Sequence, residues 1–278
     1  MKRLAMGHRT TTWARIFVLA ILVAGCRSDA LTRDEANEVL DESKIASQAE
    51  ALTSVTIELQ TDFTIGEAVE TAAAELKEAV ASQLPCADIV LTDNMLTIDY
   101  GAKDGNCTYR GHTLSGVHSV ELVENSDSQI VIEHHWEAVS NGVIAVTGDA
   151  TVTWDPNQVS RTVEHSLNFM RLSDGATGMG SGQRTQKPLP GGLDEGIIID
   201  GERNWHGPRG DWSLDIQKVE MRWTDPVPQA GSYELSTPFN KAVTLSFSRV
   251  DDTRIEVTVE GPRREFSFTV KSLGTPNG

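Results

Sequence analysis

The chain has 278 residues, of which 24 are Lys or Arg and 40 are Asp or Glu, giving a formal net charge of −16. Phosphate backbones are bound by clusters of lysine and arginine, so this charge argues against a nucleic-acid partner and opposes approach to anionic lipid headgroups. We interpret the acidity as a source of solubility, with a surface that gathers cations or a basic partner as the alternative.

The first segment, residues 1–25, has the layout of an export signal. Basic residues without any acid precede an uninterrupted apolar run at 16–25, which is the charge order of a secretory signal. A membrane-spanning helix needs about 20 apolar residues, and this run is roughly half that length. We therefore predict a signal segment and not a permanent span.

The apolar run ends in Leu22-Val23-Ala24-Gly25-Cys26, which resembles the lipobox of bacterial lipoproteins. The resemblance implies cleavage before Cys26 and attachment of a diacylglyceryl group to its thiol, so that the acyl chains hold the protein on the membrane. The alternative is an ordinary secretory signal in which the cysteine is incidental.

The residue after the lipidated cysteine predicts the destination by analogy. An aspartate there retains enterobacterial lipoproteins at the inner membrane, whereas this chain has Arg27. We therefore expect a lipid-anchored protein of the cell envelope, at the outer membrane and facing the periplasm or the surface. Cleavage would remove Lys2, Arg3, Arg9 and Arg15 and leave 20 basic residues against 40 acidic ones.

The next segments read as a tether, a strand and a helix. Residues 26–53 are polar and weakly amphipathic, which predicts a tether with a weak helix. Alternation of apolar and polar residues over 54–59 predicts a half-buried strand. Apolar residues at helical spacing predict a helix over about 65–83, capped by Thr64 and stopped by Pro85.

Two cysteines remain beyond the anchor. In an oxidising envelope compartment, Cys86 and Cys107 are predicted to form a disulfide, with two unpaired buried thiols as the alternative. Two widely spaced cysteines are too few for a structural zinc site, which needs four ligands.

Beyond Pro85 the apolar period becomes two, which is the period of strands. The alternating sets are Leu96/Ile98/Tyr100, Ile130/Ile132/His134/Trp136, Val163/His165/Leu167/Phe169, Trp212/Leu214/Ile216, Val243/Leu245/Phe247, Ile255/Val257/Val259 and Phe266/Phe268/Val270. No helical pattern separates the strands, so we predict a mainly β fold with an antiparallel sheet, as a meander, sandwich or half-barrel, after an N-terminal helical section.

Glycine and proline divide this β region. Residues 173–196 contain seven glycines and two prolines, which predicts a loop or linker. It would separate a first part at 54–172, a helix plus one antiparallel β half, from a second β half at 197–278. The string at 178–182 lacks the lysine of a phosphate loop, and we interpret it as flexible chain.

Motifs of the standard enzyme classes are missing. The sequence contains no His-Glu-x-x-His, Gly-x-Ser-x-Gly or Ser-x-x-Lys, so we expect neither a catalytic residue nor a cofactor. One metal or acid–base candidate is the pair Glu133 and His135, which share one strand face and need a further histidine, His118 or His165, from a neighbouring strand. Packing and surface hydrogen bonding are the simpler interpretation.

One family resemblance covers about twenty-five residues. The stretches Leu96–Gly101 and Gly105–Gly116 look like a strand–turn–strand module of uncharacterised Gram-negative lipoproteins. With the lipobox and the helix ending at Cys86, the chain resembles predicted outer-membrane lipoproteins of myxobacterial type. That family has no assigned activity, so the resemblance implies no catalytic residue.

We therefore predict a non-catalytic structural or binding module, held on the membrane by its lipid, with an unidentified partner. One alternative is a carrier of lipid or another hydrophobic ligand, which requires an apolar cavity inside the curved sheet. Another is an envelope hydrolase or metal-dependent enzyme, which requires polar groups to converge around His135.

Overall fold

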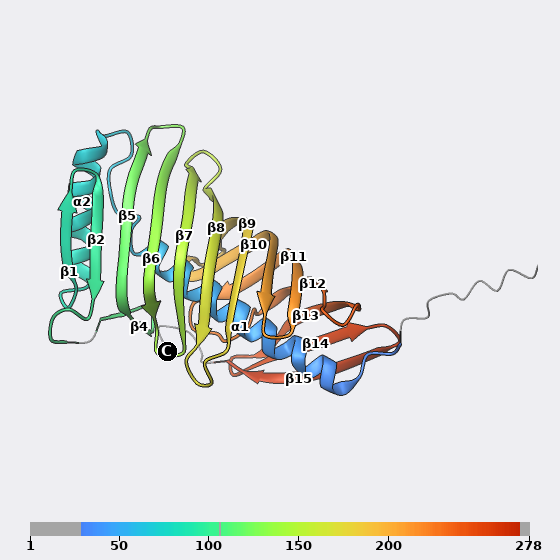
Figure 1. The fold of residues 1–278 in the computed structure, drawn as a ribbon. Coiled ribbons are helices and arrows are strands. Elements are labelled where there is room, and N and C mark those ends of the chain that lie inside the picture. The colour runs from blue at the N-terminus through green and yellow to red at the C-terminus, as the bar shows by residue number, and fades with distance from the viewer. Residues whose placement is uncertain (1–28, 106, 273–278) are drawn as a thin grey trace, which may run out of the picture.

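The computed structural model describes residues 29–105 and 107–272 (Figure 1). Its frame is one antiparallel sheet of 13 strands, joined in chain order, with a two-stranded hairpin inserted after the second strand. The strands of the sheet are β1 (Asp88–Thr92), β2 (Met95–Tyr100), β5 (Ser115–Asn125), β6 (Ile130–Ser140), β7 (Ile144–Asp155), β8 (Ser160–Arg171), β9 (Thr177–Leu189), β10 (Gly192–Gly207), β11 (Gly210–Arg222), β12 (Ala230–Ser236), β13 (Ala242–Asp251), β14 (Arg254–Gly261) and β15 (Arg264–Lys271). The inserted hairpin pairs β3 (Thr108–Tyr109) with β4 (His112–Thr113). The predicted mainly antiparallel β fold is confirmed, and the two expected β halves belong to one sheet.

The segment expected to be a linker is strand. Residues 173–196 contain β9 and the beginning of β10. In β9, Gly178, Gly180 and Gly182 alternate along the strand, and neighbouring groups occupy the space that their side chains would need. A Cβ at Gly178, for example, would lie 2.3 Å from the ring of Phe169. These glycines therefore serve close packing inside the sheet, and the prediction of a flexible loop is wrong.

The segment expected to be a tether and a strand is a single long helix. Helix α1 (Arg33–Glu58) begins with a capping box formed by Thr32 and Glu35 and continues through residues 54–59, where a strand was expected. Nearly every residue of its second half is buried. Since a helix enclosed on all sides needs no polar face, its apolar residues carry no 3.6-residue period, and the alternation at 54–59 was misleading.

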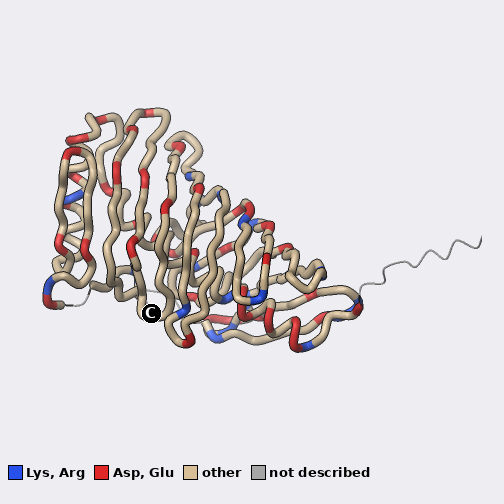
Figure 2. The backbone as a smooth tube through the Cα atoms, viewed as in Figure 1, with Lys and Arg blue, Asp and Glu red and all other residues tan. Residues whose placement is uncertain are grey.

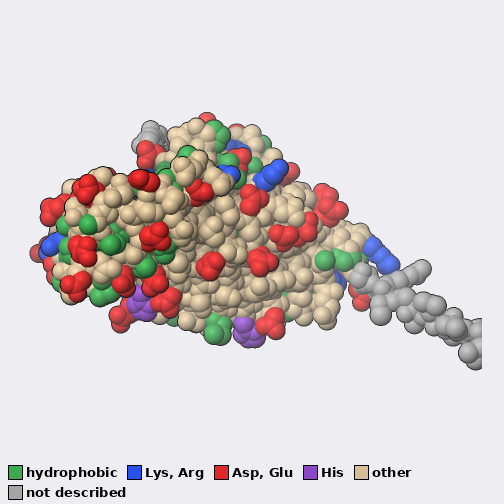
Figure 3. Space-filling view, turned by 90° about the horizontal axis from the view of Figure 1, so that it is seen from above, with side chains coloured by type: hydrophobic (Ala, Val, Ile, Leu, Met, Phe, Trp, Pro, Cys, Tyr) green, Lys and Arg blue, Asp and Glu red, His purple; other side chains and the backbone are tan. Residues whose placement is uncertain are grey.

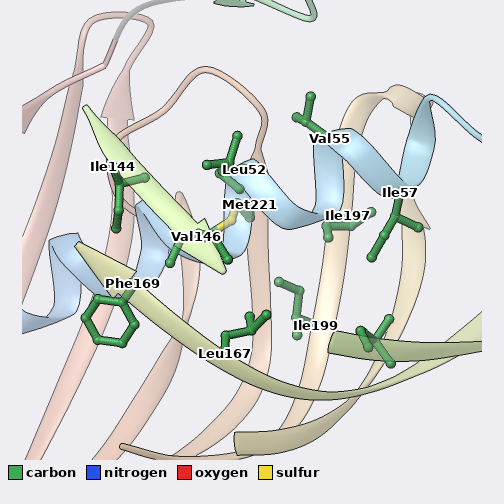
Figure 4. Packing of buried hydrophobic residues seen from close by; sticks show 14 of the residues in the cluster. Leu52, Val55, Ile57, Ile144, Val146, Leu167, Phe169, Ile197, Ile199 and Met221 are labelled. Atoms are coloured by element: carbon green, nitrogen blue, oxygen red, sulfur yellow. The ribbon is translucent and has the colours of Figure 1, made fainter. Parts of the chain in front are cut away.

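Helix α1 crosses the inner face of the curved sheet obliquely, as Figure 1 shows. Near its start, the backbone N–H of Leu31 donates to the carbonyl of Pro262 in the β14–β15 turn, and just after its end Gln60 meets His118 of β5. Figure 4 shows Leu52, Val55 and Ile57 of α1 among the buried side chains. The main core therefore lies between α1 and the sheet.

Helix α2 (Val69–Gln83) packs against β1, β2 and β5, and it confirms the helix predicted over 65–83. It begins later than predicted, with Ala68 at the N-cap position and no side-chain cap, so the prediction of a cap at Thr64 is wrong; Thr64 bonds to Glu75 within the helix. Neither helix of the described chain is long and apolar enough to cross a bilayer.

Glycine bulges bend the sheet around α1. At Gly201 the register of β10 shifts, φ is +146°, and a Cβ would lie 2.3 Å from the carbonyl oxygen of Gln183. A residue with a side chain would therefore clash with the neighbouring strand. The backbone of the sheet thus contributes to its own curvature.

The predicted disulfide between Cys86 and Cys107 is confirmed, with the two Cα atoms 5.5 Å apart. It joins the chain just after α2 to the segment that leads into the β3–β4 hairpin. Both cysteines are buried.

Removal of this disulfide should lower stability. The bond closes a loop with a sequence separation of 21, which stabilises the folded chain by about 3 kcal/mol in the chain-entropy model. We expect the double variant Cys86→Ser/Cys107→Ser to melt at a lower temperature than the wild type. Peptide mapping of exported protein without reductant should recover the linked pair, and free thiols at both positions would contradict the bond.

Candidate functional site

The histidine cluster considered from the sequence does not form. Glu133 and His135 lie on the outer face of β6, away from α1, and His135 Nδ1 is 2.6 Å from Asp149 Oδ1 of β7. His118 and His165 point to the inner face and are buried. Over residues 29–105 and 107–272 no three His, Cys, Asp or Glu side chains are grouped to hold a metal ion.

Two inner-facing histidines, His118 and His134, form a buried hydrogen-bonded chain with Gln60. Gln60 Nε2 lies 3.1 Å from His118 Nδ1, and His118 Nε2 lies 3.1 Å from His134 Nδ1. The amide of Gln60 can only donate through Nε2, so His118 accepts at Nδ1 and carries its proton on Nε2. His134 then accepts at Nδ1 and carries its proton on Nε2, which has no hydrogen-bond partner among the described residues. Both rings are therefore neutral.

Buried charges that sequence reasoning missed connect α1 to the sheet. Glu58 pairs with Arg161 of β8, and Glu50 pairs with Arg184 of β9 at 2.5 Å. Arg203 of β10 donates to the carbonyl oxygen of Ala46 at 3.2 Å. The sequence contained one signal of these pairs. Arg161 stands at the same alternate positions of β8 as the apolar residues that point inward.

Helix α1 fills the place that a hydrophobic ligand would need. Leu52 and Val55 are fully buried, and Ile57 is almost so. Burial of one such side chain contributes roughly 1.5–3 kcal/mol, and α1 buries several more, so moving the helix aside would cost more than a typical total stability of about 5–15 kcal/mol. The inner face is therefore core and not a vacant binding site.

The outer face carries a row of acidic residues across the sheet. Its members stand opposite one another in the strand register, one from each of the strands β5 to β12. In strand order the row is Glu121, Glu133, Thr151, Glu164, Gln183, Glu202, Asp215 and Glu234. We call these eight residues the acidic row; Figure 2 shows acidic positions recurring on successive strands.

Like charges meet directly in this row. Glu121 faces Glu133, and Asp215 stands between Glu202 and Glu234. Like charges directly opposite on neighbouring strands are destabilising. Six of the eight members are acidic, and the repelling sets are Glu121/Glu133 and Glu202/Asp215/Glu234. Between these sets, Glu164 lies between the neutral Thr151 and Gln183 and accepts a hydrogen bond from Gln183 at 2.6 Å.

A shallow hollow follows the acidic row. Its larger part encloses about 770 Å³ beside Glu133, Glu164 and Glu202, and a second part of about 450 Å³ continues past Asp215 and Glu234. Its described lining includes no Lys or Arg. In the view of Figure 3, acidic side chains are spread over the surface and are more frequent than basic ones.

Polar residues, most of them small, form a second row beside the acidic one, which we call the small polar row. Each lies two positions along its strand from a member of the acidic row, on the same outer face. This second row is Ser119, His135, Asp149, Ser166, Ser181, Asn204, Ser213 and Ser236. Short side chains here leave space above the sheet, and they line the same hollow.

Cys26 lies outside the described residues, so its lipidation stays a prediction. Tryptophans could offer a surface on which a ligand stacks, but Trp136, Trp205 and Trp212 are buried, and the last two stack with ring centroids 5.8 Å apart. These rings pack in the core and do not form an exposed stacking surface.

No protein-family model matches the chain, and no curated protein matches it significantly. No residue role can therefore be carried over from a relative. The two faces of the sheet differ, since α1 fills the inner face and the outer face is open and acidic.

Acid should destabilise the protein through its inner histidines. Burial lowers the pKa of His134 from 6.5 to about 3, and burial also lowers the pKa of His118 and of His165. Below about pH 6.5 the unfolded chain takes up protons at these histidines and the folded chain does not, so stability falls as pH falls. Each histidine contributes a loss of at most about 1.4 kcal/mol per pH unit, for His134 down to about pH 3.

Urea unfolding from pH 7 to pH 4 tests this expectation. His134→Gln cannot titrate at that position, so its stability should depend less steeply on pH than that of the wild type. Equal slopes in the two proteins would show that burial of His134 does not exclude its proton.

Proposed function

We propose that this chain is a non-catalytic binding module of the bacterial cell envelope that uses its outer face to bind a lysine- or arginine-rich segment of a protein partner. The observation that carries the proposal is the acidic row. Like charges meet in it, and the described residues that line the hollow beside it include no Lys or Arg. Side chains that repel one another in the free protein gain favourable partners when a polycation covers them. From the sequence, the acidity was interpreted mainly as a source of solubility. In this proposal the acidic residues on the outer face of the sheet also bind the partner.

We further propose that a lipid on Cys26 holds this module on the outer membrane. The support is the order of basic and apolar residues before Leu22–Cys26, together with Arg27 after the cysteine. A long α1 follows closely, so the body of the protein would stand near the bilayer.

The carrier and enzyme alternatives have less support. A hydrophobic-ligand carrier requires an apolar cavity inside the sheet, and α1 occupies that space. A metal or acid–base enzyme built on His135 requires a second histidine beside it, whereas His118 and His165 point to the opposite face. We therefore place binding at the outer face.

Lipidation is tested by Cys26→Ser. Cells expressing the wild type should incorporate labelled palmitate into the protein, because the thiol is the acceptor. The variant should lose the label and remain uncleaved or soluble. Unchanged labelling of the variant would rule out Cys26 as the acceptor.

Binding is tested with oligolysine and the mature chain carrying Cys26→Ser, which keeps it soluble. Calorimetry should detect binding that weakens as salt is added, because the contacts are between exposed charges. The triple variant Glu133→Gln/Glu202→Gln/Asp215→Asn should bind about tenfold more weakly, if each exposed pair contributes about 0.5 kcal/mol. It should also be at least as stable as the wild type, because repulsion within the row is relieved.

A variant with the same change in net charge provides the control. Asp62→Asn/Asp252→Asn/Glu256→Gln neutralises three exposed acids outside the acidic row. It should keep most of the affinity for oligolysine. Equal losses in the two triple variants would mean that only the overall charge matters and would defeat the proposed site.

A further inference from the structure

The hollow over the acidic row continues to an apolar end. Its main part shares Ser166, Ser181 and Asn204 with a neighbouring hollow of about 540 Å³. That hollow shares Met179 with a third part of about 400 Å³, to which Met170 also contributes. The space is therefore continuous along β8 and β9, from carboxylates at one end to methionines at the other.

Exposed apolar side chains gather at this end. Met170 is 40% exposed and Met179 58% exposed, both on the outer face. Both methionines line the third part of the hollow. Single exposed apolar residues are ordinary, but two of them lining the end of a groove indicate a contact surface. Methionine suits such a surface because its flexible side chain adapts to different partners.

The distance between the two ends sets the form of the ligand. Glu164 and Met170 lie on the same face of β8 and are six residues apart, which corresponds to about 20 Å along a strand. On β9, the acidic-row member Gln183 and Met179 are four residues apart, or about 14 Å. An extended peptide that follows these strands covers the same span with four to six of its own residues.

We propose that the hollow recognises an extended peptide segment in which a basic cluster and apolar residues are separated by four to six residues. The basic cluster lies where the peptide crosses the acidic row beside Glu164, with Glu133 and Glu202 lining the same hollow, and the apolar residues contact Met170 and Met179. This inference rests on the proposed function and adds to it a specificity for the bound chain. The partner is a peptide, since an anionic membrane surface would be repelled by the acidic row.

Three synthetic peptides test the inference on the mature chain carrying Cys26→Ser. The first has four lysines, then four serines, then two leucines. The second has serines in place of the leucines, and the third has the leucines directly after the lysines. We expect the first peptide to bind about tenfold more tightly than the second, which corresponds to about 1.4 kcal/mol for partial burial of the two leucine side chains together. The third should bind like the second.

Substitutions locate the apolar contact. Met170→Ser/Met179→Ser should remove the advantage of the first peptide and leave the affinity for the second unchanged. Val250→Ser, at an exposed apolar residue on β13, is the control and should preserve the advantage.

The possible failures are distinguishable. Equal affinity for the first two peptides, a third peptide that binds as tightly as the first, or an advantage that survives in Met170→Ser/Met179→Ser would overturn this inference and leave the proposed function intact. Absence of binding by every peptide would overturn both.

Discussion

Buried charge between α1 and the sheet is the constraint on which the rest of the structure depends. Glu58 and Glu50 pair with Arg161 and Arg184, so two turns of the helix are matched to two adjacent strands. Loss of one partner from such a buried pair costs about 3–5 kcal/mol, because the other charge is left in the core. Apolar packing alone tolerates a helix that slides or rotates, whereas these pairs accept one position of α1.

This position of α1 determines which face of every strand is available for function. Strand side chains alternate between the two faces. When one residue of a strand packs against α1, the next residue therefore points to the outer face. Arg184 points in, and Gln183 therefore points out into the acidic row; His165 points in, and Glu164 points out. A slip of one residue would bury Glu164 and expose Arg161 in β8, and would bury Gln183 and expose Arg184 in β9. The inner ion pairs and the outer acidic row are thus two results of one register.

The sequence predicted most strands, because an antiparallel sheet with one buried face produces clean alternation. Prediction from the sequence failed where a helix is buried on all sides and where a strand has glycines in place of larger residues. The second half of α1 is enclosed on all sides and lost its helical period, and β9 uses glycines where an apolar residue would have revealed a strand. The acidic row could not be read at all, because its members come from eight strands and meet only through a register that turns and bulges determine. Glu133 was noticed as a possible partner of His135, and its actual neighbours in the row are Glu121 and Thr151.

The connections of the sheet have a consequence for how the chain folds. Each strand pairs with its neighbour in sequence, so hairpins can form as the polypeptide is made, and local contacts of this kind favour rapid folding. Helix α1 is the exception, because Arg184, the partner of Glu50, is synthesised more than a hundred residues later. A newly made N-terminal half therefore exposes an incomplete helix that carries unpaired carboxylates. Those charges keep the helix segment hydrated and discourage its association with other unfinished chains. This protection lasts until β8 and β9 have been synthesised and their arginines pair with the carboxylates.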